Sequence, residues 1–241
     1  MLHGSERGLF DLSFALPSEC ANRIAAGDAD IGAVPVIEVA RQRLRIVPGA
    51  GIACRRAVRT ILLASKTPPG EIRTLAADTG SRTSVMLARV ILSHRFGAHP
   101  QVVPMPPDLD RMLARADAAL IIGDAALRLD PQALPYRVLD LGESWVEMTG
   151  LPMVFAVWAG RADRVDAALQ APFTSSCRFG LANLDTIVSQ EAPRRGVSEE
   201  LVRQYLTRNL VFELSERDYE GMRLFLDYAE QLDSALVGER Q

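Results

Sequence analysis

The loop that most constrains this fold is Asp78-Thr79-Gly80-Ser81-Arg82-Thr83-Ser84, which lies between two regular patterns. The preceding residues, 71–77, form a short and largely apolar run that predicts a buried strand. The following residues, 85–96, carry apolar side chains at helical spacing, and the run ends in His94-Arg95-Phe96-Gly97, with cationic side chains in its last turn. Such an ending predicts that the helix stops at the glycine. The chain therefore contains a strand–loop–helix unit, which is typical of α/β proteins.

The loop also carries chemistry. A glycine followed by hydroxyl residues at a helix start offers backbone N–H groups, the positive end of the helix dipole and several O–H donors. These groups suit a carboxylate or a phosphate. The alternative is that Ser81 or Thr83 only caps the helix.

Composition excludes several classes of function. With 241 residues, 48% of them hydrophobic, the chain can bury a substantial core as one larger domain or two small lobes. The net charge of −3 gives no electrostatic footprint for nucleic acid or an anionic membrane. Lys66 is the only lysine and lies in a turn-like stretch, which argues against Schiff-base chemistry.

The three cysteines are widely separated, and the three histidines form no ligand-spaced pair. We therefore expect no disulfide framework, no metal site and no cofactor. No apolar stretch reaches transmembrane length, and the N-terminus lacks a signal core. These features predict a cytoplasmic protein whose partner is a small molecule. A homodimer is left open.

Strand-like and helix-like segments alternate through the first half of the chain, which favours an α/β fold with largely parallel sheets. From about Arg161 onward the pattern is helical. A turn is expected at Pro48–Gly51. Extended segments are expected at 9–16, 31–35, 44–47, 57–64, 71–77, 101–105, 118–122 and 151–158.

Two long apolar strands, Ala57–Ala64 and Met153–Trp158, bracket a self-contained βαβ block. We expect them to cross between two lobes, with the final helices packed on lobe one. The boundaries would be 1–64 for the first part of lobe one, 65–157 for lobe two and 158–241 for the helical remainder of lobe one. Ligands of such folds bind at strand carboxyl ends, here in a cleft between the lobes.

Seven pieces of the chain, in order, resemble the chorismate dehydratase family of the futalosine route to menaquinone. They run through most of the chain and weaken after about residue 160. The pieces are Pro17-Ser18-x-Cys20-Ala21 with Gly27-x-x-Asp30-Ile31-Gly32, Val34-Pro35-Val36-Ile37-Glu38, Pro48-Gly49-x-Gly51-Ile52, Asp78 to Ser84, Asp117 to Leu127, Asp140-Leu141-Gly142-Glu143-x-Trp145, and Thr149 to Trp158.

This resemblance implies a two-lobed fold of the type II periplasmic-binding-protein kind with an interlobe cleft. It implies loss of water from chorismate, giving 3-[(1-carboxyvinyl)oxy]benzoate. The family begins with a strand carrying a Ser-Tyr-Leu-Asn-Ala-like motif, whereas this sequence starts at Met1-Leu2-His3-Gly4. We therefore expect the chain as given to lack one strand of lobe one and part of the site.

We expect Ser84 and Thr83 to serve catalysis by donating hydrogen bonds to developing charge. None of the matched motifs contains a histidine, so the substrate's own enolpyruvyl carboxylate is our hypothesis for the base. Seven residues are expected to bind substrate: Ser81, Arg82, Pro35, Val36, Cys54, Gly123 and Asp124.

Several of these residues have an alternative, purely structural role. Asp124 could cap the helix after its strand, and Cys54 could be a small buried residue. Trp145 and Trp158 suit core packing as well as ligand stacking. Arg55, Arg56 and Arg59 could attract a dianion or form an exposed rim.

Two other functions remain. One is the related 1,4-dihydroxy-6-naphthoate synthase of the same pathway, and the other is a non-catalytic small-anion-binding module.

Overall fold

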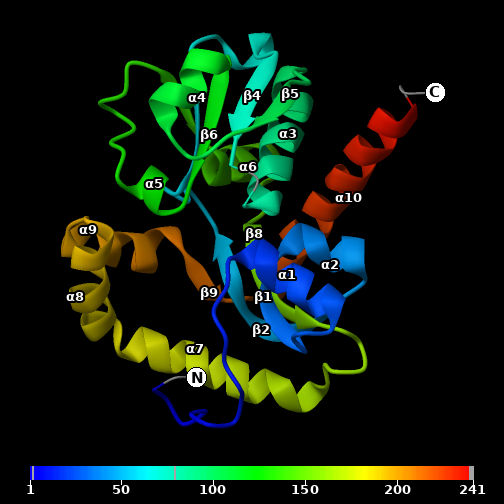
Figure 1. Cartoon of the computed structure of the whole chain (residues 1–241), viewed down its shortest axis with the longest axis vertical. Coiled ribbons are helices and arrows are strands. Elements are labelled where there is room, and N and C mark those ends of the chain that lie inside the picture. Colours follow the sequence, from blue (N-terminus) through cyan, green and yellow to red (C-terminus); the bar gives the residue numbers. More distant parts are fainter. Residues whose placement is uncertain (2, 79, 239–241) are drawn as a thin grey trace. The chain divides into compact units, whose positions relative to one another are not determined.

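The computed structural model describes residues 1, 3–78 and 80–238, which divide into two compact units. The first unit contains Met1–Ala53 and Val154–Tyr219. The second contains Cys54–Met153 and the chain from Glu220 onward. Each unit has its own sheet (Figure 1).

The first unit has a four-stranded sheet in the order β1-β8-β2-β9. β1 pairs antiparallel with β8, with Ile31 opposite Gly160, and β2 pairs antiparallel with β9. Its elements are α1 (Pro17–Ala26), β1 (Ile31–Pro35), α2 (Val36–Gln42), β2 (Arg45–Cys54), β8 (Met153–Gly160), α7 (Gln170–Ala182), α8 (Leu184–Arg195), α9 (Glu199–Gln204) and β9 (Val211–Glu213), with a 3₁₀ turn at Ala167–Leu169 and a π-helical turn at Tyr205–Asn209.

The second unit has a five-stranded sheet in the order β5-β4-β6-β3-β7. β4 runs parallel to β5 and β6, whereas β3 runs antiparallel to β6 and β7. Its elements are β3 (Ile61–Ser65), β4 (Thr74–Ala77), α3 (Arg82–Phe96), β5 (Gln101–Pro104), α4 (Leu109–Arg115), β6 (Ala118–Ile122), α5 (Asp124–Leu127), β7 (Arg137–Asp140), α6 (Leu141–Thr149) and most of α10 (Glu216–Gly238), with a 3₁₀ turn at Pro69–Glu71.

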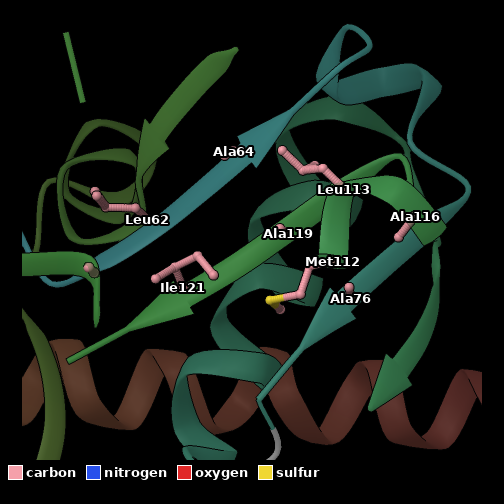
Figure 2. Close-up of a cluster of buried hydrophobic side chains, with 9 residues drawn as sticks. Leu62, Ala64, Ala76, Met112, Leu113, Ala116, Ala119 and Ile121 are labelled. Carbon is pink, nitrogen blue, oxygen red and sulfur yellow. The ribbon is translucent and has the colours of Figure 1, made fainter. Parts of the chain in front are cut away.

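Apolar strand faces and helix α4 build part of the second unit's core. Figure 2 shows Met112 and Leu113 of α4 against residues of β3, β4 and β6. Ala76 and Ala119 are fully buried in this cluster. Their small side chains let the helix approach the sheet closely. The cluster packs α4 against the apolar face of the sheet, which stabilises both elements.

Helix α10 joins the second unit through aromatic contacts. The ring of Trp145, which is fully buried, lies edge-on to Phe225 and Tyr228, and its indole N–H donates to the carbonyl of Pro152 (3.1 Å). Arg89 of α3 pairs with Asp233. The expectation that all final helices pack on lobe one is therefore wrong for α10, although α7, α8 and α9 do belong to the first unit.

Three local expectations were also wrong. Residues 9–16 form no strand, and Leu9, Phe14 and Leu16 are 63%, 77% and 66% exposed. The turn at Pro48–Gly51 is instead the middle of β2, where Gly49 adopts a φ of 93° and donates its N–H to the hydroxyl of Tyr219. The strand expected at 57–64 is shorter, because the segment before Ile61 turns and the chain is extended only from Ile61 to Ser65.

The sheets are not largely parallel, since four of the six strand pairs with described register are antiparallel: both described pairs of the first unit and two of the four in the mixed sheet of the second. The two units also differ from the lobes expected at 1–64, 65–157 and 158–241. β3 pairs inside the second unit's sheet rather than crossing between units, so the chain leaves the first unit at the end of β2. Near Met153 the observed change of unit agrees with the expected crossing.

Candidate functional site

The candidate residues of the second unit lie at one edge of its sheet, which we call the carboxyl edge. It is defined by the ends of β4, β5, β6 and β7 at Ala77, Pro104, Ile122 and Asp140, and by the start of β3 at Ile61. Ala77 lies opposite Pro104 and Leu120, while Ile61 lies opposite Ile122. Strand pairing alone therefore brings the loops after β4 and β6 to the same edge, where ligands of open α/β sheets bind.

The loop after β4 leads directly into α3. The N–H of Gly80 donates to the Asp78 carboxylate (2.9 Å), which forms a tight turn, and Thr79 lies outside the described residues. The first intrahelical bond runs from the N–H of Val85 to the carbonyl of Ser81 (3.2 Å). This loop places the positive end of the α3 dipole at the carboxyl edge.

The hydroxyl residues of this loop are mostly enclosed. Thr83 and Ser84 are 1% exposed, and the hydroxyl of Ser84 lies 2.8 Å from that of Ser81. Ser81 occupies the N-cap position of α3, but its side chain makes no capping hydrogen bond. The Ser81–Ser84 pair can turn one O–H outward, so the helix start combines a dipole with an adjustable donor.

The loop after β6 is a turn that requires a glycine. Gly123 has φ 64° and ψ −139°, a conformation that only glycine adopts without strain, and a Cβ there would meet nothing within 4 Å. Its N–H donates to the carbonyl of Thr60 (2.8 Å). Gly123 holds the N-cap position of the one-turn helix α5, so exposed Asp124 is its first residue rather than its cap.

Sequence reasoning missed Asp140 as an organising residue of this edge. Its two carboxylate oxygens accept from the N–H groups of Val58 (2.9 Å) and Arg59 (2.6 Å). One of them also accepts from the N–H of Glu143 (3.1 Å), so Asp140 caps α6. The sequence does carry a signal for the cap, because an Asp before an amphipathic run favours a helix start.

Arg59 contacts the helix that follows Gly123. Its guanidinium donates to the carbonyls of Ala126 (3.0 Å) and Leu127 (3.3 Å) and makes a further short hydrogen bond to the carbonyl of Leu129. Burial lowers the pKa of this guanidinium, and nearby carboxylates oppose that shift. Arg59 is therefore neither an exposed rim residue nor a free cation for a ligand, whereas Arg55 and Arg56 are exposed.

The three remaining candidates are Cys54 of the second unit and Pro35 and Val36 of the first. Cys54 is fully buried, and its Sγ is only 2.6 Å from where a Cβ on Gly142 would stand, so it packs against the start of α6. Pro35 and Val36 are buried in the first unit, where β1 ends and α2 begins. A role of these three residues in binding stays a prediction.

Both tryptophans pack within their own units. Trp145 lies in the α10 contact described above, and Trp158 lies edge-on to Phe173 (4.9 Å between ring centroids). Glu147 pairs with Arg95 (2.7 Å). Within the described residues, no three side chains of His, Cys, Asp or Glu gather to hold a metal ion, and no helix is long and apolar enough to cross a membrane.

Solved structures share this fold at low sequence identity. Protein AF1704 from Archaeoglobus fulgidus matches with a TM-score of 0.68 and 17% identity, over 91% of this chain and 85% of that one. The periplasmic aliphatic sulphonate binding protein SsuA from Escherichia coli matches with a TM-score of 0.63 and 16% identity, over 93% and 76%. The chain therefore has the α/β fold of periplasmic binding proteins, as expected.

Sequence comparison identifies the family. The chorismate dehydratase of Thermus thermophilus is 30% identical over 236 residues, covering 90% of this chain and 86% of that protein. A family model described as menaquinone biosynthesis matches residues 2–231. The match spans both units, including every residue of the carboxyl edge, and the chain belongs to this menaquinone biosynthesis family.

Proposed function

We propose that this chain is a chorismate dehydratase, a carbon–oxygen lyase that removes water from chorismate to give 3-[(1-carboxyvinyl)oxy]benzoate. The observation that carries the proposal is the similarity to the Thermus thermophilus chorismate dehydratase over nine-tenths of the chain. The carboxyl edge supports it independently, because its helix start and hydroxyl groups suit an anionic substrate.

Chorismate carries a ring carboxylate and an enolpyruvyl carboxylate, so binding requires donors for a dianion. The start of α3 supplies the helix dipole and the hydroxyls of Ser81 and Ser84. Arg82, the first residue of α3, adds a positive charge beside them. In this proposal the same groups stabilise the charge that develops on a substrate carboxylate during the reaction.

The chemistry needs little more than orientation. The C3 hydrogen of chorismate is vinylogous to the ring carboxylate, so its removal sends negative charge through the diene to that group. Expulsion of the 4-hydroxyl then produces the aromatic ring, and aromatisation supplies the driving force. The enolpyruvyl carboxylate of the substrate takes the proton, which is consistent with the lack of a histidine among the residues assigned to the site.

The direct test is incubation of the purified chain with chorismate, followed by ultraviolet and mass detection of a product that has lost one water. Ser84→Ala and Thr83→Ala should each lower kcat/KM. The loss should correspond to about 1.5–3 kcal/mol of transition-state stabilisation, the value of one hydrogen bond to a charged group. Ser93→Ala is the matched control, because Ser93 lies near the other end of α3.

Each outcome separates the candidate functions. Binding of chorismate without turnover would favour an anion-binding module, and neither binding nor turnover would favour the related 1,4-dihydroxy-6-naphthoate synthase. If both alanine variants keep full activity, the assignment of the α3 start is wrong. A bell-shaped pH profile with an enzyme group titrating between about pH 5 and 8 would contradict the substrate-derived base.

A further inference from the structure

We propose that Arg59 is a positioning residue, which fixes the turn at Gly123 and Asp124 at the carboxyl edge through its guanidinium and through Asp140. This inference rests on the proposed function and extends it to a residue that does not touch the substrate. Four features support this inference: the short helix α5, the contacts of the Arg59 guanidinium, the strained backbone of Arg59 and the Asp140 carboxylate.

Helix α5 is too short to hold its own shape. It spans Asp124–Leu127, a single turn, and a helix of that length is unstable without outside contacts because nucleation is costly. Its last carbonyls have few partners within the helix. The guanidinium of Arg59 donates to the carbonyls of Ala126, Leu127 and Leu129, so one side chain ties down the end of the turn that Gly123 begins.

The backbone fixes the other end of the same turn. The N–H of Gly123 donates to the carbonyl of Thr60, the residue directly after Arg59 (2.8 Å). The segment around Arg59 therefore holds the N-cap residue of α5 and the carbonyls at and just after its end. A shift of this segment would move Gly123 and Asp124 relative to the loop that starts α3.

Arg59 itself is held in a strained conformation. Its φ is 70°, in the left-handed region that costs a non-glycine residue free energy, and such residues cluster at functional sites. The carboxylate of Asp140 accepts from its N–H and from the N–H of Val58, which stabilises the conformation. Because Asp140 also caps α6, one carboxylate connects the end of β7, the start of α6 and the segment before β3, and it acts on α5 through the Arg59 side chain.

Arg43 provides a matched contrast. It is the other non-glycine residue with positive φ (54°) among the described residues, and it lies exposed at the C-cap of α2 in the first unit. Arg43→Gly and Arg59→Gly remove the same charge and relieve the same kind of backbone strain. They differ in that only the second removes the guanidinium from α5.

The experiment compares KM and kcat for chorismate in wild type, Arg43→Gly, Arg59→Gly and Arg59→Lys. Arg59→Gly should raise KM about tenfold or more, the equivalent of one lost hydrogen bond to a charged group, with kcat within about twofold. Arg59→Lys should fall in between, because an ammonium cannot reach several carbonyls in a fork. Arg43→Gly should match wild type.

Two further readouts separate positioning from a general loss of stability. A smaller folded fraction lowers the apparent kcat and leaves KM unchanged. Added guanidinium chloride, at a concentration far below the unfolding range, should lower the KM of Arg59→Gly towards wild type, whereas equal sodium chloride should not. In Arg59→Gly, hydrogen exchange at the amides of Arg128 and Leu129 should be faster than in wild type, and exchange in α3 should be unchanged.

The possible failures are distinct. If the wild type does not convert chorismate, the proposed function is refuted, and a positioning role in that reaction is refuted with it. If the wild type is active and Arg59→Gly has wild-type KM, or loses only apparent kcat without rescue by guanidinium, the positioning role alone is refuted.

Discussion

At each edge of the five-stranded sheet, one aspartate side chain accepts hydrogen bonds from two consecutive backbone N–H groups. The two edges differ in the backbone segment that the aspartate stabilises. At the carboxyl edge, Asp140 accepts from the N–H groups of Val58 and Arg59. At the opposite edge, which we call the amino edge and define by the starts of β4, β5, β6 and β7 and the end of β3, Asp117 accepts from the N–H groups of Arg73 and Thr74.

The difference lies in the backbone that each carboxylate stabilises. Asp117 also accepts from the hydroxyl of Thr74, and its own N–H donates back to that hydroxyl (3.0 Å), so it fastens the start of β4 to the start of β6. Asp140 instead holds a strained arginine that grips α5. The same carboxylate–backbone contact can therefore serve stability alone or also a binding site. Which of these it serves depends on the backbone segment that the carboxylate holds.

Removal of the two carboxylates should separate these roles most strongly. Asp140→Ala leaves three backbone N–H groups without their acceptor, so we expect a loss of about 3 kcal/mol in unfolding free energy and a raised KM for chorismate. Asp117→Ala should cost about 1–2 kcal/mol and leave KM unchanged. Urea unfolding and steady-state kinetics measure both. An unchanged KM in Asp140→Ala would make the two edges equivalent.

A glycine pair sharpens the same comparison. Gly123 and Gly97 both have positive φ and open space where a Cβ would stand, but Gly97 is an ordinary αL cap at the far end of α3. Gly97→Ala should therefore cost about 1 kcal/mol, and Gly123→Ala about 3 kcal/mol because its ψ of −139° lies outside the αL region. Thermal unfolding gives the order, and equal losses would show that the Gly123 turn relaxes freely.

The smallest expected effect is the pH response of Asp117. Hydrogen bonding, above all from the side chain of Thr74, lowers the pKa of this carboxyl. A lowered folded pKa gives stability that is fully present above the unfolded pKa, about 4, and is lost as pH falls through the folded pKa. The difference in unfolding free energy between wild type and Asp117→Asn should shrink below about pH 4. A difference that stays constant down to about pH 2 would contradict this.

Local signals explain which parts of the fold were predictable. The α3 unit follows from an apolar run, a glycine-hydroxyl loop and helical spacing, and Gly97 ends the helix as expected. The starts of α9 and α10 carry local signals of the same kind, because Ser198 accepts from the N–H of Leu201 and the hydroxyl of Ser215 donates to Asp218. In each case the determining residues lie within one or two helical turns of each other.

The missed features depend on partners far along the chain. Asp140 and Arg59 are separated by 81 residues, so neither the strained φ nor the grip on α5 has a local signature. The passage of β2 through Gly49 depends on Tyr219, which is 170 residues away. Residues 9–16 give the opposite error, a local signal without the structure it predicts. Their apolar side chains suggest a buried strand, but several of them are exposed.

The most direct test of substrate binding at the carboxyl edge is hydrogen exchange with and without saturating chorismate, because it compares both edges of the sheet in one experiment. We predict slower exchange in peptides that cover residues 80–87 and 122–129, and unchanged exchange in peptides that cover 66–74 and 97–101. Protection confined to the amino edge, or no protection at the start of α3, would contradict the claim that the carboxyl edge binds the substrate.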